Sequence, residues 1–361
     1  MTEPCISVGI LTDGNPTVTQ TGDYTQVEGV VIGKQFHWEQ RLCLKYAGKI
    51  EQTDHGLINR LPIEDYIKSV VSSEMNPKAP VEFIRAHAII SRSWAMRKLY
   101  IKESPSDGIR HSDSEIITWQ ESDTHIGFDV CSDDHCQRYQ GITNINSRVE
   151  KAVESTRGIL LTDTDSGTIA DARFSKCCGG ETELFSTCWA DKDMPYLTHI
   201  HDPYCNPDRL SQEQRITILS DILKDYDVST DYYRWEESVT PQQIRVNLQN
   251  RFDIDKGRVI SLEPIEYGKS GRIKLLKVIC ENGEIIIGKE LAIRRLLSPT
   301  HLFSSAFEIE SQTDRFLLHG RGWGHGVGLC QIGAAVMASE GKSAEEILSF
   351  YFPNTSLVKF Y

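Results

Sequence analysis

The stretch His319-Gly-Arg-Gly-Trp-Gly-His-Gly-Val-Gly328 holds side chains suited to ligand binding, with glycine at every second position from Gly320. In an extended segment, successive side chains point to opposite faces, so one face would be bare. A bare face lets a ligand or another backbone approach closely. The other face would present two imidazoles, a guanidinium and an indole, from His319, Arg321, Trp323 and His325. These groups suit a polar, ring-shaped ligand such as a sugar; the alternative is a tightly packed strand with the tryptophan in the core.

Glu74 is the residue most suited to acid–base chemistry. It lies on the apolar stripe of a helix predicted over 62–75, in line with Ile67 and Val71. Burial disfavours a charged carboxylate and raises its pKa, which makes a proton donor available near neutral pH. The alternative is a helix-terminal glutamate that faces solvent.

Arg92 and His87 belong to a second helix, predicted over 80–100, whose alanine-rich middle suits close packing. Both side chains could point into a cleft. For Arg92 the alternative is an ordinary surface or ion-pair arginine.

The segment 125–136 combines His125, Cys131 and Cys136, with His135 beside the last cysteine. Imidazole and thiolate are the ligands that zinc prefers. The spacing between the cysteines is wider than in a common zinc knuckle, so a pair of free buried thiols is the alternative. If zinc binds there, a structural clip is favoured over a catalytic centre, and a zinc hydrolase is the weakest functional hypothesis.

A glycine turn over 175–183 is rich in hydrogen-bonding groups and contains Gly179, Gly180, Glu181 and Thr182. Such a turn can offer backbone N–H groups to a ligand, although it can also be simply a good loop.

The composition excludes several kinds of partner. A formal net charge of −12 argues against nucleic acid, which requires a basic surface, and against anionic lipid. No run of 18 apolar residues is present, which predicts that no segment spans a membrane. No signal peptide is visible, so the ten cysteines are expected to be reduced, and the sequence leaves the localisation open.

The elements that must position these residues indicate an α+β fold with mixed β-sheets and packed helices. Short strands are expected over 5–60, and strands resume over 258–288 after a charged helical stretch. We therefore divide the chain into a core part over 1–210, an inserted accessory helical element over 211–252, and a C-terminal part over 253–361 that carries the glycine-rich stretch.

Several motifs together resemble the SpoIID/LytB family, which comprises stage II sporulation protein D and the amidase enhancers. They are Leu61-Pro-Ile-Glu-Asp-Tyr-Ile, Val71-Ser-Ser-Glu-Met75, Ala88-Ile-Ile-Ser-Arg-Ser-Trp-Ala95, Cys178-Gly-Gly-Glu-Thr-Glu183, Pro195-Tyr-Leu197 and the glycine-rich stretch through Gln331. The resemblance extends from the first strand almost to the last residue and is weakest over 211–252. The chain departs from the family at Cys177 and Cys178, where serines are usual.

The resemblance implies a lytic transglycosylase that cleaves the MurNAc–GlcNAc bond of peptidoglycan glycan strands and leaves 1,6-anhydro-MurNAc ends. By motif position, Glu74 would be the single general acid and base, and Arg92 an active-site arginine that holds Glu74 or a substrate group. His125, Cys131 and Cys136 would bind structural zinc. Relatives are usually exported, which implies the cell envelope or periplasm.

The substrate-binding residues expected from these motifs lie in the glycine turn and the glycine-rich stretch. They are Gly179, Gly180, Glu181, Thr182, Arg321, Trp323, His325 and Gln331. The competing hypothesis is a non-catalytic module that binds glycan and stimulates a partner cell-wall amidase.

Overall fold

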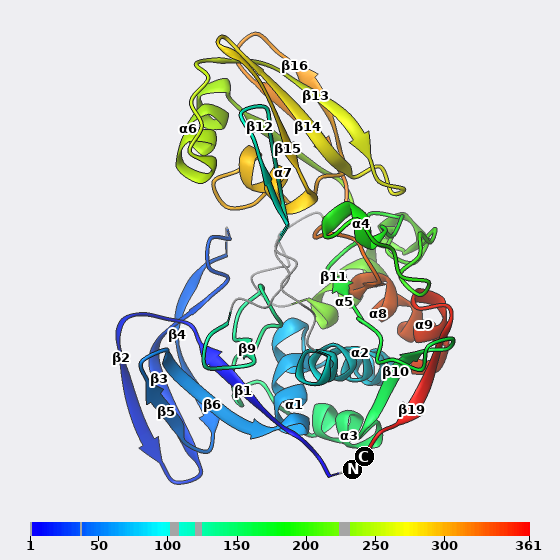
Figure 1. Cartoon of the computed structure of the whole chain (residues 1–361). Coiled ribbons are helices and arrows are strands. Elements are labelled where there is room, and N and C mark those ends of the chain that lie inside the picture. The colour runs from blue at the N-terminus through cyan, green and yellow to red at the C-terminus, as the bar shows by residue number, and fades with distance from the viewer. Residues whose placement is uncertain (1, 37, 102–107, 120–124, 224–231) are drawn as a thin grey trace.

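The computed structural model describes residues 2–36, 38–101, 108–119, 125–223 and 232–361 (Figure 1). Strands fill the first sixty residues and form two sheets, with strand orders β5-β6-β1-β9 and β2-β3-β4. The strands are β1 (Cys5–Ile10), β2 (Thr12–Thr21), β3 (Tyr24–Ile32), β4 (Gln40–Ala47), β5 (Ile50–Thr53), β6 (Gly56–Pro62) and β9 (Val130–Cys131).

Three helices lie beside these sheets in the lower part of the molecule (Figure 1). They are α1 (Ile63–Glu74), α2 (Val81–Tyr100) and α3 (Ser147–Ser155). α1 begins directly after Pro62, whose fixed φ suits a helix start, and it ends before Asn76-Pro77. α2 contacts helices on several sides, so most of its middle is buried, as its alanine-rich sequence predicts.

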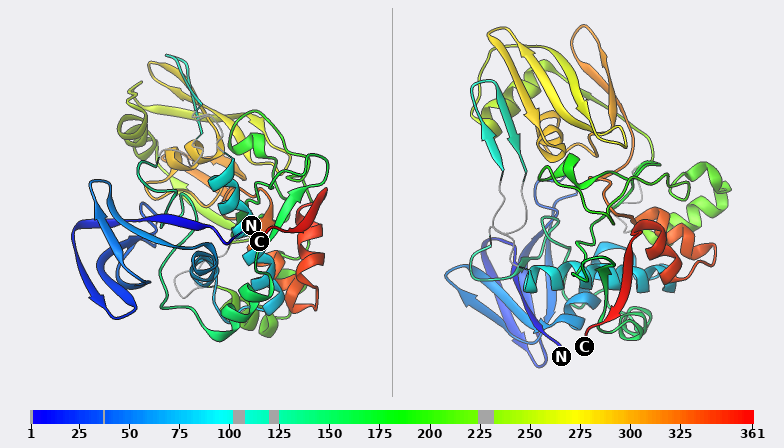
Figure 2. Two further views of the ribbon diagram at one scale, coloured as in Figure 1. Left: turned by 60° about the horizontal axis from the view of Figure 1, so that its bottom comes forward. Right: turned by 45° about the vertical axis from the view of Figure 1, so that its right-hand side comes forward.

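The remainder of the lower part comes from distant segments of the chain. β10 (Ile159–Asp163) pairs with β19 (Thr355–Lys359), and β11 (Phe174–Ser175) pairs in parallel with β18 (Leu329–Cys330). The two ends of the chain lie side by side (Figures 1 and 2). The helices here are α4 (Phe185–Cys188), η1 (Pro207–Arg209), α5 (Gln212–Ile222), α8 (Gln331–Ser339) and α9 (Ala344–Tyr351).

The upper lobe has a separate hydrophobic core, around Leu276, Ile287 and Leu318. It contains a five-stranded sheet, β13-β14-β15-β8-β7, and a three-stranded sheet, β12-β17-β16, with helices α6 and α7 (Figure 1). The elements are β7 (Ile109–His111), β8 (Glu115–Thr118), β12 (Trp235–Val239), α6 (Pro241–Phe252), β13 (Val259–Tyr267), β14 (Ile273–Cys280), β15 (Gly283–Gly288), α7 (Glu290–Leu297), β16 (Phe307–Ser311) and β17 (Phe316–Gly320).

The α+β class is confirmed. Within the stretch 211–252, α5 packs against α8, whereas α6 packs in the upper lobe. Residues 109–111 and 115–118 pair as β7 and β8 with the upper sheet. Among the described residues, no helix is long and apolar enough to cross a membrane.

Candidate active site

A cleft of about 720 Å³ lies where the N-terminal strands, the central helices and the upper lobe meet. Its walls bring together three features that are far apart in the sequence. These are Glu74, the segment 125–136, and the glycine-rich stretch through Trp323, His325 and Gln331.

Glu74 is the last residue of α1, and only 6% of its surface is exposed. Its Oε1 accepts the backbone N–H of Arg138 at 2.9 Å, and its Oε2 lies 3.9 Å from the Arg138 Nε. Burial raises the pKa of Glu74, and the charge of Arg138 only partly offsets this. The negative end of the helix dipole acts in the same direction as burial.

Arg138 is a site residue that the sequence reasoning missed. Its guanidinium is held by Asp134 at 2.8 Å and lies 4.2 Å from the centre of the Trp38 ring. Asp134 lies within the Cys/His segment 125–136, and Arg138 follows two residues after Cys136. Their position beside the predicted zinc ligands was the signal available in the sequence. A zinc site close to Glu74 would bring the residues next to its ligands close to Glu74 as well.

Arg92 does not hold Glu74. Its guanidinium forms a buried ion pair with Glu64, at 2.9 and 2.7 Å, near the opposite end of α1. Ten residues of α-helix separate Glu64 from Glu74, a rise of about 15 Å. Burial opposes ionisation of Glu64, but the hydrogen bonds and charge of Arg92 outweigh it and lower the Glu64 pKa. The ion-pair alternative for Arg92 is therefore the arrangement that the structure contains.

The glycine-rich stretch is not an extended strand. β17 ends at Gly320, and Gly322, Gly324, Gly326 and Gly328 all adopt a positive φ between 74° and 90°. The left-handed conformation recurs at every second residue, so the side chains do not share one face. Trp323 and His325 line the cleft, whereas Arg321 turns away and donates from Nη2 to the carbonyl of Ser270 at 2.6 Å.

His325 is a neutral hydrogen-bond donor in this setting. Burial, together with Arg173 and Arg272, lowers its pKa well below the ordinary value. Its Nδ1 accepts the N–H of Val327 at 3.0 Å, so the proton of the neutral ring belongs on Nε2. The ring also packs edge-on against Trp189, which in turn carries the Arg173 guanidinium at 4.3 Å from its ring centre.

Gln331 and His87 meet at one wall of the cleft. The Nε2 of Gln331 lies 3.0 Å from the His87 Nε2, and both side chains are buried. Burial lowers the pKa of His87 to about 3, so this imidazole is also neutral.

The predicted substrate contacts in the glycine turn lie outside the cleft. Gly179 packs on the backbone of Gly322, and Glu181 pairs with His199 and His201. Thr182 is buried and donates to the carbonyl of Thr198 at 2.9 Å. This turn therefore supports the glycine-rich stretch from behind. Ser175 and Lys176, at its start, do line the cleft.

The segment 125–136 gathers four potential metal ligands at the cleft: His125, Cys131, His135 and Cys136. One ligand atom of each lies within 4.8 Å of the other three. The His125 Nε2 is 3.1 Å from the Cys136 Sγ, and the Cys131 Sγ is 3.9 Å from the His135 Nδ1. Ligands around tetrahedral zinc lie about 3.5–3.8 Å apart, so these residues fit the ion. His135 adds a fourth ligand to the three that the sequence indicated.

Several polar atoms in the cleft walls have no hydrogen-bond partner among the described residues. They are Asp134 Oδ2, Gln137 Nε2, Ser175 Oγ and His301 Nδ1. Buried polar groups are almost always paired, so these atoms indicate that the cleft accommodates a polar ligand or water.

Two regions of the chain match known protein families, and known proteins are similar to most of its length. Residues 51–162 match the sequence model of the stage II sporulation protein family, SpoIID, and residues 183–328 match a domain of unknown function, DUF8618. Stage II sporulation protein D of Bacillus subtilis (strain 168) is 26% identical over 316 residues, which cover 85% of this chain and 78% of that protein. The amidase enhancer of the same organism is 24% identical over 320 residues, covering 81% of this chain and 40% of that protein.

A further relative, an uncharacterized protein of Brachyspira hyodysenteriae (strain ATCC 49526 / WA1), is 28% identical over 305 residues, 84% of this chain and 68% of that protein. These matches support a relationship between this chain and the SpoIID/LytB proteins. The matched region 51–162 contains Glu74, the Cys/His segment, Arg138 and the upper-lobe strands β7 and β8. The region 183–328 contains the rest of the upper lobe together with Trp323 and His325.

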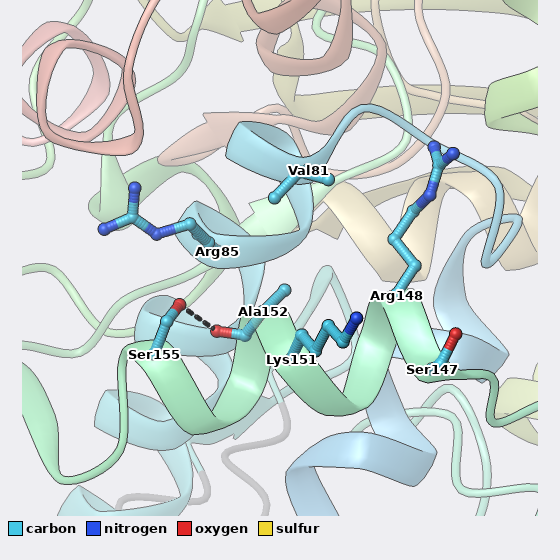
Figure 3. A pocket seen from close by; sticks show the side chains of 7 residues that line it. All are labelled: Val81, Arg85, Ser147, Arg148, Lys151, Ala152 and Ser155. Atoms are coloured by element: carbon cyan, nitrogen blue, oxygen red, sulfur yellow. Dashed lines mark hydrogen bonds between the residues drawn. The ribbon is translucent and has the colours of Figure 1, made fainter.

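The chain has another hollow, of about 500 Å³, between α2 and α3 (Figure 3). Its basic side chains extend apart from one another, and Arg148 donates to the backbone carbonyl of Lys78 at 2.8 Å. Arg85 pairs with Glu82 at 2.9 Å. No carboxylate or imidazole lines this hollow, so we assign the candidate acid–base chemistry to the cleft.

Proposed function

We propose that this protein is a lytic transglycosylase acting on peptidoglycan glycan strands, with Glu74 as its acid and base. The observation that carries the proposal is one buried glutamate of raised pKa at the wall of a large cleft with aromatic and unpaired polar groups. A raised pKa extends to higher pH the range in which the carboxyl is protonated and can donate a proton to a glycosidic oxygen.

In the proposed reaction, the backbone N–H of Arg138 donates a hydrogen bond to Oε1 of Glu74, and the carboxyl proton is on Oε2. Glu74 protonates the oxygen that leaves C1 of the muramic acid. The resulting carboxylate then takes the proton from the muramic-acid 6-hydroxyl as that oxygen attacks C1. One C–O bond forms as another breaks, so the product is an anhydro sugar and no water is consumed.

Arg138 stabilises the carboxylate between these two proton transfers, because its guanidinium lies 3.9 Å from the Glu74 Oε2. Gln137 and Ser175 provide hydrogen-bonding groups for sugar hydroxyls, and Trp323 provides an aromatic wall. Zinc held by His125, Cys131, His135 and Cys136 would clip the loop that supplies Asp134 and Arg138, a structural role.

The test is digestion of denuded and intact peptidoglycan by the wild type, by Glu74→Gln and by Glu150→Gln, with products identified by mass spectrometry. Glu150 is an exposed glutamate in the first turn of α3 and serves as the matched control. Anhydro-muramyl ends should form with the wild type and the control, and should fall about 10²- to 10⁴-fold in Glu74→Gln. Reducing ends in place of anhydro ends would instead indicate hydrolysis with a second carboxylate, for which Asp134 is the nearest choice.

The second proposal is a glycan-binding protein that stimulates a cell-wall amidase, and the similarity to an amidase enhancer supports it. This role predicts that Glu74→Gln still binds denuded strands and still stimulates an amidase. It also predicts that the wild type alone releases no fragments from either substrate.

A further inference from the structure

A second group of metal-ligating side chains lies behind the glycine-rich wall. It consists of Cys178, Asp202, Cys205 and Cys330, all buried, with one ligand atom of each within 4.8 Å of the other three. The four come from three segments, namely the turn after β11, the loop before η1, and the residue that caps the start of α8.

The spacing within this cluster is that of ligands around one ion. The Sγ atoms of Cys178 and Cys205 are 3.5 Å apart, and the Cys178 Sγ is 3.2 Å from the Asp202 Oδ2. Zinc–sulfur bonds of about 2.3 Å and zinc–oxygen bonds of about 2.1 Å place tetrahedral ligands about 3.6–3.8 Å apart. A disulfide would require the two sulfurs at about 2.05 Å.

We propose that Cys178, Cys205 and Cys330, together with the carboxylate of Asp202, bind one zinc ion as a closed, structural site. Three sulfurs and one oxygen suit zinc better than magnesium or calcium, which prefer oxygen ligands alone. Binding converts the three thiols to thiolates and releases their protons. All four ligands belong to the protein, so this ion has no open position for a substrate.

The surroundings already provide the donors that such a site requires. Metal ligands are usually oriented by outer hydrogen bonds, which also offset the excess negative charge. The Cys330 Sγ and the Asp202 carboxylate each accept two hydrogen bonds. The donors are Cys178 N–H at 3.3 Å and Gly333 N–H at 3.4 Å to the sulfur, and Tyr204 N–H and Tyr351 O–H, both at 2.9 Å, to the carboxylate.

Gly333 is a specific requirement of this arrangement. A Cβ at position 333 would lie 2.5 Å from the Asp202 Oδ2, so only glycine lets the carboxylate approach the start of α8 this closely. The first turn of α8 also places its N-terminal dipole against the thiolate of Cys330.

The ion would brace the active-site cleft from behind. The residue before Cys178, Cys177, pairs through its backbone with Trp323, at 2.8 and 3.1 Å. The residue after Cys330 is Gln331, which lines the cleft. The metal therefore fixes two cleft residues that it does not touch. Loss of the ion is expected to lower both the melting temperature and the glycan-binding capacity of the protein.

The test is metal analysis in a Cys131→Ser/Cys136→Ser background, which removes the other metal group. This protein should retain one zinc ion per chain, and additional Cys205→Ser or Cys330→Ser should abolish it. Cys280→Ser is the matched control, because Cys280 is a buried cysteine of the upper lobe, and it should leave the metal content unchanged. Cobalt in place of zinc should give thiolate-to-metal charge-transfer bands that disappear with the same variants.

A background protein that is folded by circular dichroism yet lacks metal would overturn the proposal. So would a Cys178–Cys205 disulfide found by mass spectrometry, or metal that persists in Cys330→Ser. If the serine variants fail to fold, stepwise blocking of thiols in the folded background protein replaces them, and zinc release should then follow the blocking of buried cysteines. These measurements read metal content rather than catalysis, so they stand or fall independently of the proposed transglycosylase activity.

Discussion

Glu74 differs from an ordinary surface glutamate because burial raises its pKa, an increase that the charge of Arg138 partly offsets. If the protonated form starts the reaction, activity is present at lower pH and is lost as the pH rises through the pKa of Glu74. Removing the positive charge in Arg138→Gln should raise that pKa further, so the alkaline limb of the kcat profile should move to higher pH.

The same variant should lower kcat about 10- to 100-fold, because losing one charge-assisted contact costs about 1.5–3 kcal/mol. Arg173→Gln is the control, since this cleft arginine rests on Trp189 and Asp171 rather than on Glu74. The measurement is kcat against pH for all three proteins. An alkaline limb that stays in place in Arg138→Gln would show that Glu74 is not the group that titrates.

Arg92 belongs to the stability of the protein rather than to its chemistry. Arg92→Met leaves Glu64 buried without its cation and should destabilise the fold by about 3–5 kcal/mol. Adding Glu64→Gln removes the orphaned charge and should recover part of that loss. Chemical denaturation measures both effects. A single variant as stable as the wild type but inactive would restore a catalytic role for Arg92.

At the scale of elements, the helices were the most predictable part of the fold. The helices predicted over 62–75 and 80–100 match α1 and α2 to within a residue, because apolar periodicity and flanking prolines define both. A capping box of Ser343 and Glu346 also forms at the start of α9.

The parts that could not be predicted depend on long-range packing. Alternating glycines suggested an extended strand, but local patterning does not reveal that Gly328 must pass close to the Arg173 carbonyl in a left-handed conformation. Likewise, Arg92 and Arg138 are both arginines near the predicted site in sequence. Glu64 and Glu74 lie near opposite ends of α1. The packing of this helix therefore determines that Arg138 contacts Glu74 and Arg92 contacts Glu64.

Gly328→Ala tests this account of the glycine-rich element. A left-handed backbone costs alanine about 1–2 kcal/mol, and here the new methyl group would also collide with the Arg173 backbone carbonyl. Gly341→Ala is the matched control, because Gly341 has φ +88° and no atom lies within 4 Å of the place that its new methyl group would take. We expect Gly328→Ala to lose clearly more unfolding free energy than Gly341→Ala. Equal losses in denaturant titrations would contradict the packing argument.

At the scale of the whole molecule, the cleft has the opposite charge balance to the protein. The chain carries a formal charge of −12, yet the cleft is lined by six lysines and arginines against four aspartates and glutamates. Each denuded muramic acid carries a free lactyl carboxylate. A locally basic cleft on an acidic protein would direct such an anionic strand to Glu74 rather than to the rest of the surface.

This electrostatic steering predicts a charge-reversal effect that depends on position. Lys34 is exposed at the cleft, and Lys34→Glu should lower kcat/KM for denuded strands several-fold at low ionic strength. The loss should shrink as salt is added, because the screening length falls to about 8 Å at 0.15 M ionic strength. Lys49→Glu changes the net charge equally at an exposed turn outside the cleft, and it should have little effect. The same loss in both variants would mean that net charge, rather than the cleft, governs how the strand is captured.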